Sequence, residues 1–156
     1  MEARLSASGN PIAERTLKHL TSINATIANS PLPTATQELV KIRASQINGC
    51  GFCVDMHTKD AAASGESPVR INLVAGWREA TVYTDAERVA LELAEQGTRL
   101  ADSAGVSDDL WAAATTHYDE AQLSSLVSLI AVINAFNRIN VITQQPAGDY
   151  QPGQFG

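Results

Sequence analysis

Two cysteines and a histidine stand close together near the middle of the chain, at Cys50, Cys53 and His57. If this segment is helical, the three side chains lie along one stripe. The free N–H groups and the dipole at a helix start favour a thiolate, which is the reactive form of cysteine. A C-x-x-C pair can close a small disulfide after one sulfur is oxidised, and an imidazole one turn away can take the thiol proton. The spacing therefore predicts thiol–disulfide chemistry.

The same motif also occurs as half of a zinc site. A structural zinc site takes four ligands, commonly from a second such pair, and this sequence has none. A catalytic zinc held by Cys50, Cys53 and His57 is the remaining metal alternative. A c-type haem needs histidine directly after the second cysteine, where Val54 stands. Two inert buried cysteines fit poorly with the flanking glycines and with polar Asp55. We therefore expect no metal and no cofactor.

Glu38 is a candidate proton-transfer residue on the helix expected before the cysteines. It is next to Leu39 and shares a helical face with Ile42 and Ser45, so it borders the predicted core. Most glutamates in such positions are partly solvated surface residues. From spacing alone, a surface role and a catalytic role both stay open.

Helical patterns cover nearly the whole chain between two loose ends. No segment alternates polar and apolar residues for long enough to be a strand, which predicts an all-α fold. Proline, glycine and capping signals predict about seven helices. Capping boxes are expected at Thr34–Gln37 and Thr84–Glu87, and the segment Asp119–Gln122 is expected to open the last helix. The expected segments are a flexible arm at 1–10, a helical domain at 11–145, an extended tail at 146–156, and helices at about 11–29, 34–48, 50–63, 68–77, 84–101, after Ser107, and 119–143.

Composition and charge exclude several function classes for the 156 residues. The formal net charge of −6 and the lack of a basic stripe argue against nucleic acid and anionic membranes as partners. The polar N-terminus does not resemble a signal peptide, and the apolar stretch 123–136 is too short to span a bilayer. We therefore expect a cytoplasmic protein. Because that stretch is apolar nearly all round, its helix should lie inside a bundle or in a subunit interface.

The segment around the cysteines resembles a known family. The segment has a pattern in which Glu38 is followed by eleven residues, a Cys-x-x-Cys pair, three more residues and His57. This pattern is similar to the active-site signature of AhpD-like alkylhydroperoxidases, which belong to the carboxymuconolactone decarboxylase superfamily. The likeness covers roughly residues 38–141. It is also carried by Leu39–Gly49, Val54–Ala61, Gly76–Glu79, Tyr83–Arg88 and Ile133–Arg138.

The resemblance implies an AhpD-like helical bundle that assembles as homotrimers or homohexamers. It implies that organic hydroperoxides are reduced without haem or metal, at the expense of a thiol reductant of thioredoxin, glutathione or lipoyl type. It also implies that Cys53 meets the peroxide, that Cys50 resolves the product, and that Glu38 joins His57 in a proton relay. The superfamily's decarboxylases lack the cysteine pair, so decarboxylation is not expected.

One position departs from the family pattern. The best-known members have a histidine directly before the second cysteine, where this chain has Phe52. A simpler relay and a reductant other than a lipoyl protein are therefore both open.

A polar patch on the last helix is a candidate wall of the substrate pocket. Asn134, Asn137 and Arg138 are spaced i, i+3 and i+4 on an otherwise apolar helix. They either satisfy one another or line the cavity where Glu38, His57 and the cysteines meet. In the second case Trp77 and Tyr83 are candidate apolar walls.

Three functions compete at this stage. The first is a peroxide-reducing enzyme, and the second is a relay whose substrate is another protein's disulfide. The third is a redox-sensing oligomer in which the disulfide is only a switch.

Overall fold

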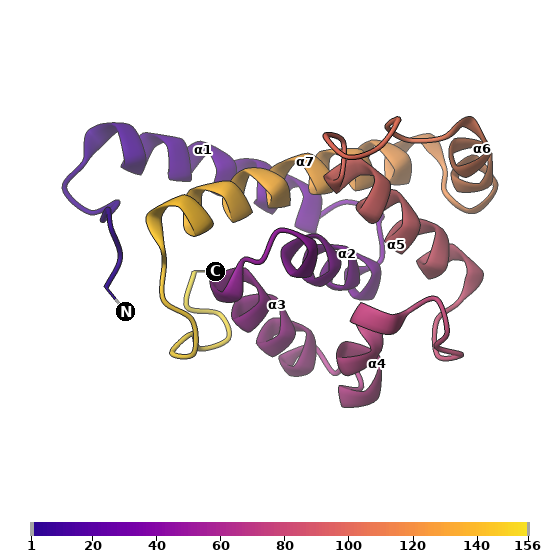
Figure 1. The fold of residues 1–156 in the computed structure, drawn as a ribbon, viewed down its shortest axis with the longest axis horizontal. Helices are drawn as coiled ribbons and strands as arrows, with labels where there is room; N and C mark the ends of the chain where they lie inside the picture. Colours follow the sequence, from indigo (N-terminus) through magenta and orange to yellow (C-terminus); the bar gives the residue numbers. More distant parts are fainter. Residues whose placement is uncertain (1, 156) are drawn as a thin grey trace.

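Helix α2 runs through the middle of the molecule, where it contacts α3, α5 and α7 (Figure 1). The computed structural model describes residues 2–155. These residues contain no strand, so the predicted all-α fold is confirmed. The helices are α1 (Pro11–Ala28), α2 (Thr34–Ile47), α3 (Gly51–Ala63), α4 (Pro68–Leu73), the short 3-10 helix η1 (Val74–Gly76), α5 (Asp85–Thr98), α6 (Asp108–His117) and α7 (Glu120–Thr143).

One of the two expected capping boxes forms, and a further box starts α7. Thr84 and Glu87 cap α5 reciprocally, and Asp119 and Gln122 do the same for α7. The box expected at Thr34 and Gln37 was wrong, because α2 begins after Pro33 without a side-chain cap. The Gln37 amide instead donates to the carbonyl groups of Ile27 and Leu32, which ties the loop before α2 to the helix. The fourth helix is also shorter than predicted, since the chain tightens into η1 after Leu73.

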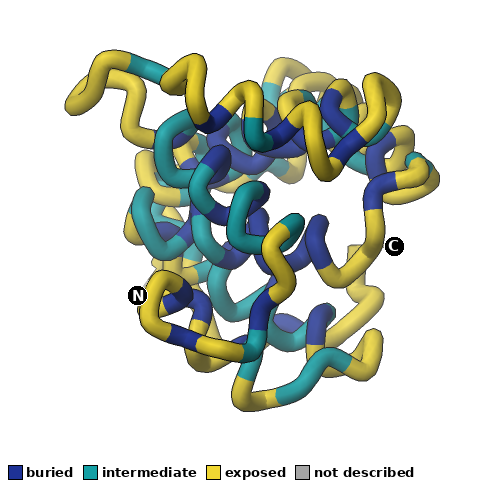
Figure 2. Tube along the Cα trace, turned by 90° about the vertical axis from the view of Figure 1, so that its right-hand side faces the viewer, coloured by how far each residue is buried: buried dark blue, intermediate teal, exposed yellow. Residues whose placement is uncertain are grey.

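Buried apolar residues form two clusters that meet on α2. Figure 2 shows the buried positions of the chain in dark blue. One cluster joins α2 to α5, α6 and α7, and the other joins α2 to α3, α4 and α5. Nine of the fourteen residues of α2 are buried, including the charged Glu38 and Lys41. A helix enclosed on so many sides holds its side chains in fixed positions, which suits a site that needs precise geometry.

The outer surfaces of α1 and α7 keep several large apolar side chains exposed. On α1 only Ile27 is buried, whereas Ile12 is 80% exposed. On α7, Leu126 and Leu129 are fully buried, but Ile142 is 68% exposed. By length and composition α7 is the one described helix that could cross a membrane, a test that core helices also pass. In this fold α7 packs against α1, α2 and α5.

Both chain ends lie against the helices. The Arg4 amide donates to the Thr143 carbonyl, so the expected N-terminal arm contacts the end of α7. Residues 146–155 fold back along α3 and end in a turn, where an extended tail was expected. Tyr150 is buried there, with its hydroxyl 2.9 Å from Asp60 Oδ1. Met1 and Gly156, the outermost residues of the expected arm and tail, lie outside the described residues.

Candidate active site

The turn between α2 and α3 places both cysteines at the start of a helix. Gly49 has φ of +66°, a left-handed conformation that glycine adopts without strain. The Cys50 amide then donates to the Ser45 carbonyl, which closes the turn. Cys50 is the N-cap of α3, and its Sγ accepts the Cys53 amide N–H at 3.3 Å. A sulfur at this position faces the positive end of the helix dipole.

Cys50 and Cys53 form a disulfide, with their Cα atoms 5.4 Å apart. The spacing of the motif predicts this closure. Cys50 and Cys53 are 1% and 2% exposed, so both residues are almost completely shielded from solvent.

Glu38 lies against His57 across the interface of α2 and α3. Its Oε2 is 3.1 Å from His57 Nδ1, and its Oε1 accepts a hydrogen bond from Lys41 Nζ at 2.8 Å. Burial raises the pKa of Glu38, but His57 and Lys41 together outweigh it and lower that pKa to about 2. The carboxylate is therefore ionised at neutral pH. Because Nδ1 faces Glu38, Nε2 is the ring nitrogen left for exchanging a proton with a thiol.

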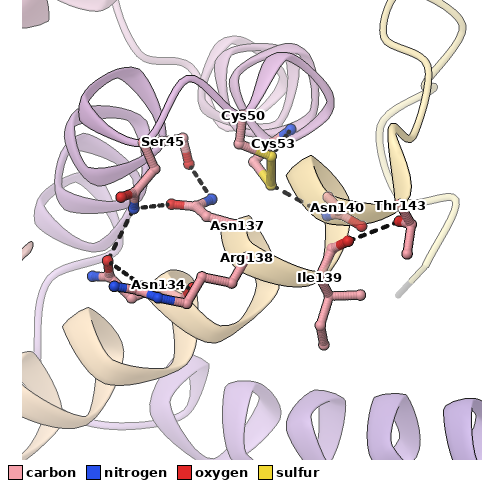
Figure 3. Close-up of a disulfide and its surroundings, with 10 residues drawn as sticks. Ser45, Cys50, Cys53, Asn134, Asn137, Arg138, Ile139, Asn140 and Thr143 are labelled. Atoms are coloured by element: carbon pink, nitrogen blue, oxygen red, sulfur yellow. Dashed lines mark hydrogen bonds between the residues drawn. A yellow bond between two sulfur atoms is a disulfide. The ribbon is translucent and has the colours of Figure 1, made fainter.

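Lys41 and Asn140 belong to this site, and the sequence reasoning missed both. Lys41 is 6% exposed and neutralises Glu38 from one turn further along α2. Its i, i+3 spacing from Glu38 was the available signal, since a buried carboxylate requires a partner. Asn140, on the last turns of α7, donates from Nδ2 to Cys53 Sγ at 3.3 Å (Figure 3). Nothing in the local sequence indicates that contact.

A hollow in the surface lies beside Cys50, between α3 and the folded-back tail. It is bounded mainly by small residues, and Cys50 belongs to its lining whereas Cys53 does not. The lining residues are Ser45, Gln46, Gly49, Cys50, Gly51, Val54, Asp55, Thr58, Ala147 and Gly148. Through this hollow Cys50, but not Cys53, borders the protein surface.

The polar patch of α7 is part of a buried hydrogen-bond network (Figure 3). The Asn48 amide donates to the side-chain oxygens of Asn134 and Asn137, each at 2.9 Å. Asn137 is fully buried and donates to Ser45 Oγ at 3.0 Å. Arg138 donates to Asn134 Oδ1 at 3.0 Å. The patch therefore satisfies itself and the end of α2, and none of its members lines the hollow.

Trp77 and Tyr83 pack in the core cluster shared by α2, α3, α4 and α5. The Trp77 indole donates to Glu95 Oε1 at 2.8 Å, and the Tyr83 hydroxyl donates to the Arg70 carbonyl. Both side chains hold neighbouring helices together, and neither lines the hollow beside Cys50. Their role as pocket walls stays a prediction.

Within residues 2–155, no group of three or more histidine, cysteine, aspartate and glutamate side chains is arranged to hold a metal ion. The expectation that the protein binds no zinc stays a prediction.

Comparison with known proteins assigns the chain to a family. The model of the carboxymuconolactone decarboxylase family matches residues 13–96, just over half of the chain. The chain belongs to this family, in its AhpD-like group. The match covers Glu38, Lys41, both cysteines and His57, whereas Asn140 lies beyond it.

Two relatives have no assigned activity. The chain is 42% identical over 130 residues to the uncharacterized protein YdfG of Bacillus subtilis (strain 168), covering 83% of this chain and 88% of the relative. It is 34% identical over 118 residues to the uncharacterized protein YnjA of Escherichia coli (strain K12), covering 76% of this chain and 64% of the relative.

Solved structures confirm the AhpD-like fold. A protein of unknown function from Agrobacterium tumefaciens, whose name relates it to the antioxidant defence protein AhpD, superimposes with a TM-score of 0.87. It is 31% identical, and the match covers 96% of this chain and all of that one. The debrominase Bmp8 superimposes with a TM-score of 0.78 at 19% identity, covering 92% of this chain and 75% of that one, and so supports the fold alone.

Proposed function

We propose that this protein reduces organic hydroperoxides with electrons from a thiol reductant. The observation that carries the proposal is the buried contact between Glu38 and His57. His57 lies on α3, one turn after Cys53, which forms a disulfide with Cys50. An ionised carboxylate 3.1 Å from Nδ1 holds the imidazole in one orientation. His57 is then placed to take the proton of Cys53 and to return it to the leaving oxygen.

The proposed cycle has three balanced steps. The Cys53 thiolate attacks one peroxide oxygen, the O–O bond breaks, and the alkoxide takes a proton to leave as an alcohol. The Cys50 thiol then attacks the Cys53 sulfenic acid, which forms the disulfide and releases water. Two thiols of the reductant finally reduce the disulfide and become a disulfide themselves. Membership of the AhpD-like group and the name of the Agrobacterium relative support this choice of substrate.

The reductant and the setting are part of the proposal. We propose a thioredoxin-, glutathione- or lipoyl-type thiol as the reductant, and a homotrimer or homohexamer in the cytoplasm as the working form. The exposed apolar faces of α1 and α7 support self-association. Phe52, which replaces the histidine of the best-known members, lies beside Phe155 of the tail with ring centroids 6.3 Å apart. The position directly before Cys53 is thus used for packing, which supports a relay of Glu38 and His57 alone.

Peroxidase kinetics of the wild type beside single cysteine variants test the function. With cumene hydroperoxide and dithiothreitol, the wild type should turn over and both Cys50→Ser and Cys53→Ser should lose turnover. The Cys50→Ser protein should still be oxidised once at Cys53, which a sulfenic acid trap detects. A wild type that leaves the peroxide untouched would overturn the peroxidase proposal.

A thiol–disulfide relay is the second candidate, favoured by one observation. Cys50 lines the surface hollow while Cys53 does not, an arrangement that suits attack on the disulfide by a thiol from outside. Fast reduction by thioredoxin or a lipoyl protein, with poor peroxide turnover, would select this candidate. Redox-dependent change of oligomeric state without any turnover would instead select the redox-sensing oligomer.

A further inference from the structure

Two different N–H groups face the two sulfurs of the disulfide. Cys50 Sγ accepts the backbone amide of Cys53, and Cys53 Sγ accepts Asn140 Nδ2, each at 3.3 Å (Figure 3). Within residues 2–155 these are the hydrogen-bond donors to the pair. The hydrogen-bond donor to Cys50 therefore comes from the start of its own helix. The donor to Cys53 comes from α7, at a residue 87 positions further along the chain.

Asn140 differs from the other asparagines on its side of α7. Asn134, Asn137 and Asn140 are spaced three residues apart, so they descend one stripe of the helix toward the disulfide. The first two amides are engaged in the network with Asn48. The Asn140 amide takes no part in that network, and its hydrogen bond goes to sulfur.

We infer that Asn140 is a catalytic residue that stabilises the thiolate of Cys53. The inference rests on the proposed thiol chemistry but not on the identity of the oxidised substrate. A hydrogen bond to an ionised acceptor is roughly twice as strong as one between neutral groups. The Asn140 amide therefore favours the Cys53 thiolate over both the neutral thiol and the disulfide sulfur.

The same donor acts in both halves of the cycle. When Cys53 attacks a peroxide, Asn140 keeps the nucleophile ionised until the sulfur–oxygen bond forms. When a reductant thiolate enters the hollow, it attacks Cys50 Sγ, and the sulfur–sulfur bond breaks. The electron pair leaves on Cys53 as a thiolate that Asn140 holds, while Cys50 carries the mixed disulfide. A second reductant thiol attacks that mixed disulfide at the reductant's own sulfur, which releases Cys50 to take a proton.

Thiol titration tests the inference without any peroxide. In a Cys50→Ser background, the iodoacetamide alkylation rate of Cys53 against pH reports its thiol pKa. We expect Asn140→Leu to raise that pKa by about one unit, as the loss of one charge-assisted hydrogen bond requires. Asn140→Asp should raise it further, since a carboxylate in the same place repels the thiolate.

Two matched controls accompany these variants. Thr143→Val removes the neighbouring hydroxyl, which donates to the Ile139 carbonyl, and should leave the pKa of Cys53 unchanged. In a Cys53→Ser background, Asn140→Leu should leave the pKa of Cys50 unchanged, because the donor to Cys50 is the backbone at position 53.

The relative sizes of the Cys53 pKa shifts in Asn140→Leu and Asn140→Asp distinguish a catalytic role from a packing role. If Asn140 only fills space, the nearly isosteric Asp is the milder change and Leu the more disruptive one, which would overturn the inference. An unchanged thiol pKa in both variants would overturn it as well. A wild type without peroxide turnover would count against the proposed peroxidase, while the pKa order of the variants would still decide the role of Asn140.

Discussion

Glu38 Oε2 and His57 Nδ1 lie 3.1 Å apart in the interior, although the two residues are 19 positions apart in the chain. The two side chains are thus within direct hydrogen-bonding distance. Lys41 completes the arrangement on the other carboxylate oxygen at 2.8 Å. The site therefore holds a buried lysine, carboxylate and imidazole in a row, and changes at one member affect the charge balance of the others.

Replacing Glu38 should lower turnover and stability together. Glu38→Gln should reduce peroxide turnover by about 10²–10⁴-fold, the usual worth of general acid–base help. It should also cost on the order of 3 kcal/mol of unfolding free energy, because the Lys41 ammonium is left without its partner in the interior. Urea unfolding and steady-state kinetics measure the two effects.

The double variant Glu38→Gln/Lys41→Met is the matched control, because it removes both charges. It should regain much of the stability and none of the activity. His57→Gln should lose turnover to the same degree, and combining it with Glu38→Gln should cost little more, since the pair acts as a unit. Full activity in Glu38→Gln would return Glu38 to a structural role.

Acid should destabilise the native protein through Glu38. Its pKa falls from 4.5 to about 2 on folding, so below pH 4.5 the unfolded chain takes up the proton first. The contribution of Glu38 to stability is complete above that pH and is lost as the pH falls toward 2. We expect the wild type to lose stability relative to Glu38→Gln/Lys41→Met between pH 5 and pH 3, because only the wild type has the Glu38 carboxylate to protonate. A difference independent of pH would contradict an ionised, paired Glu38.

Loss of the Asn137 side chain should destabilise the fold. Asn137→Ala removes a fully buried amide and leaves the partner groups of Asn48 and Ser45 unsatisfied, at a cost of roughly 1–3 kcal/mol. Because Ser45 also anchors the turn before Cys50, turnover should fall as well. Arg138→Ala, on the exposed side of the same turn, should stay within about 0.5 kcal/mol of the wild type. Equal losses in the two variants, measured by urea unfolding, would argue against the network.

The folded-back tail should restrict access to Cys50. Lys59 Nζ donates to the carbonyl oxygens of Gly148 and Tyr150, at 2.8 and 2.9 Å, and Ala147 borders the hollow. Lys59→Met should loosen the tail, increase hydrogen exchange at residues 148–150, and speed alkylation of Cys50 in a Cys53→Ser background. The exposed Lys18→Met on α1 is the control. Unchanged alkylation with a loosened tail would show that the tail does not limit access.

The protein should associate through the apolar surfaces of α1 and α7. Sedimentation velocity should show a homotrimer or homohexamer at micromolar concentration. Ile12→Asp and Ile142→Asp, at two of the most exposed apolar positions, should weaken it. Thr21→Asp, an exposed polar position on α1, is the matched control. A stable monomer of the wild type would contradict this prediction.

Local sequence patterns were enough for the elements and the reactive pair. Capping residues mark the starts of α5, α6 and α7, because a cap is satisfied by backbone groups two or three residues away. The motif at Cys50 and Cys53 implies disulfide closure for the same reason, since both sulfurs lie within one helical turn. The box expected at Thr34 and Gln37 did not form because the N-cap of α2 is Pro33, one residue earlier, which has neither a side-chain cap nor a backbone N–H to donate.

Contacts between distant segments depended on how the helices pack. Glu38 meets His57 because α2 lies on α3, and Lys41 is buried beside them for the same reason. The spacing of the polar patch on α7 fits both a pocket wall and a self-contained hydrogen-bond network. Only the position of Asn48 shows that Asn134 and Asn137 bond to the end of α2. Asn140 reaches Cys53 from the far end of the chain. Periodicity describes which face a residue occupies, whereas tertiary packing decides which atom that face meets.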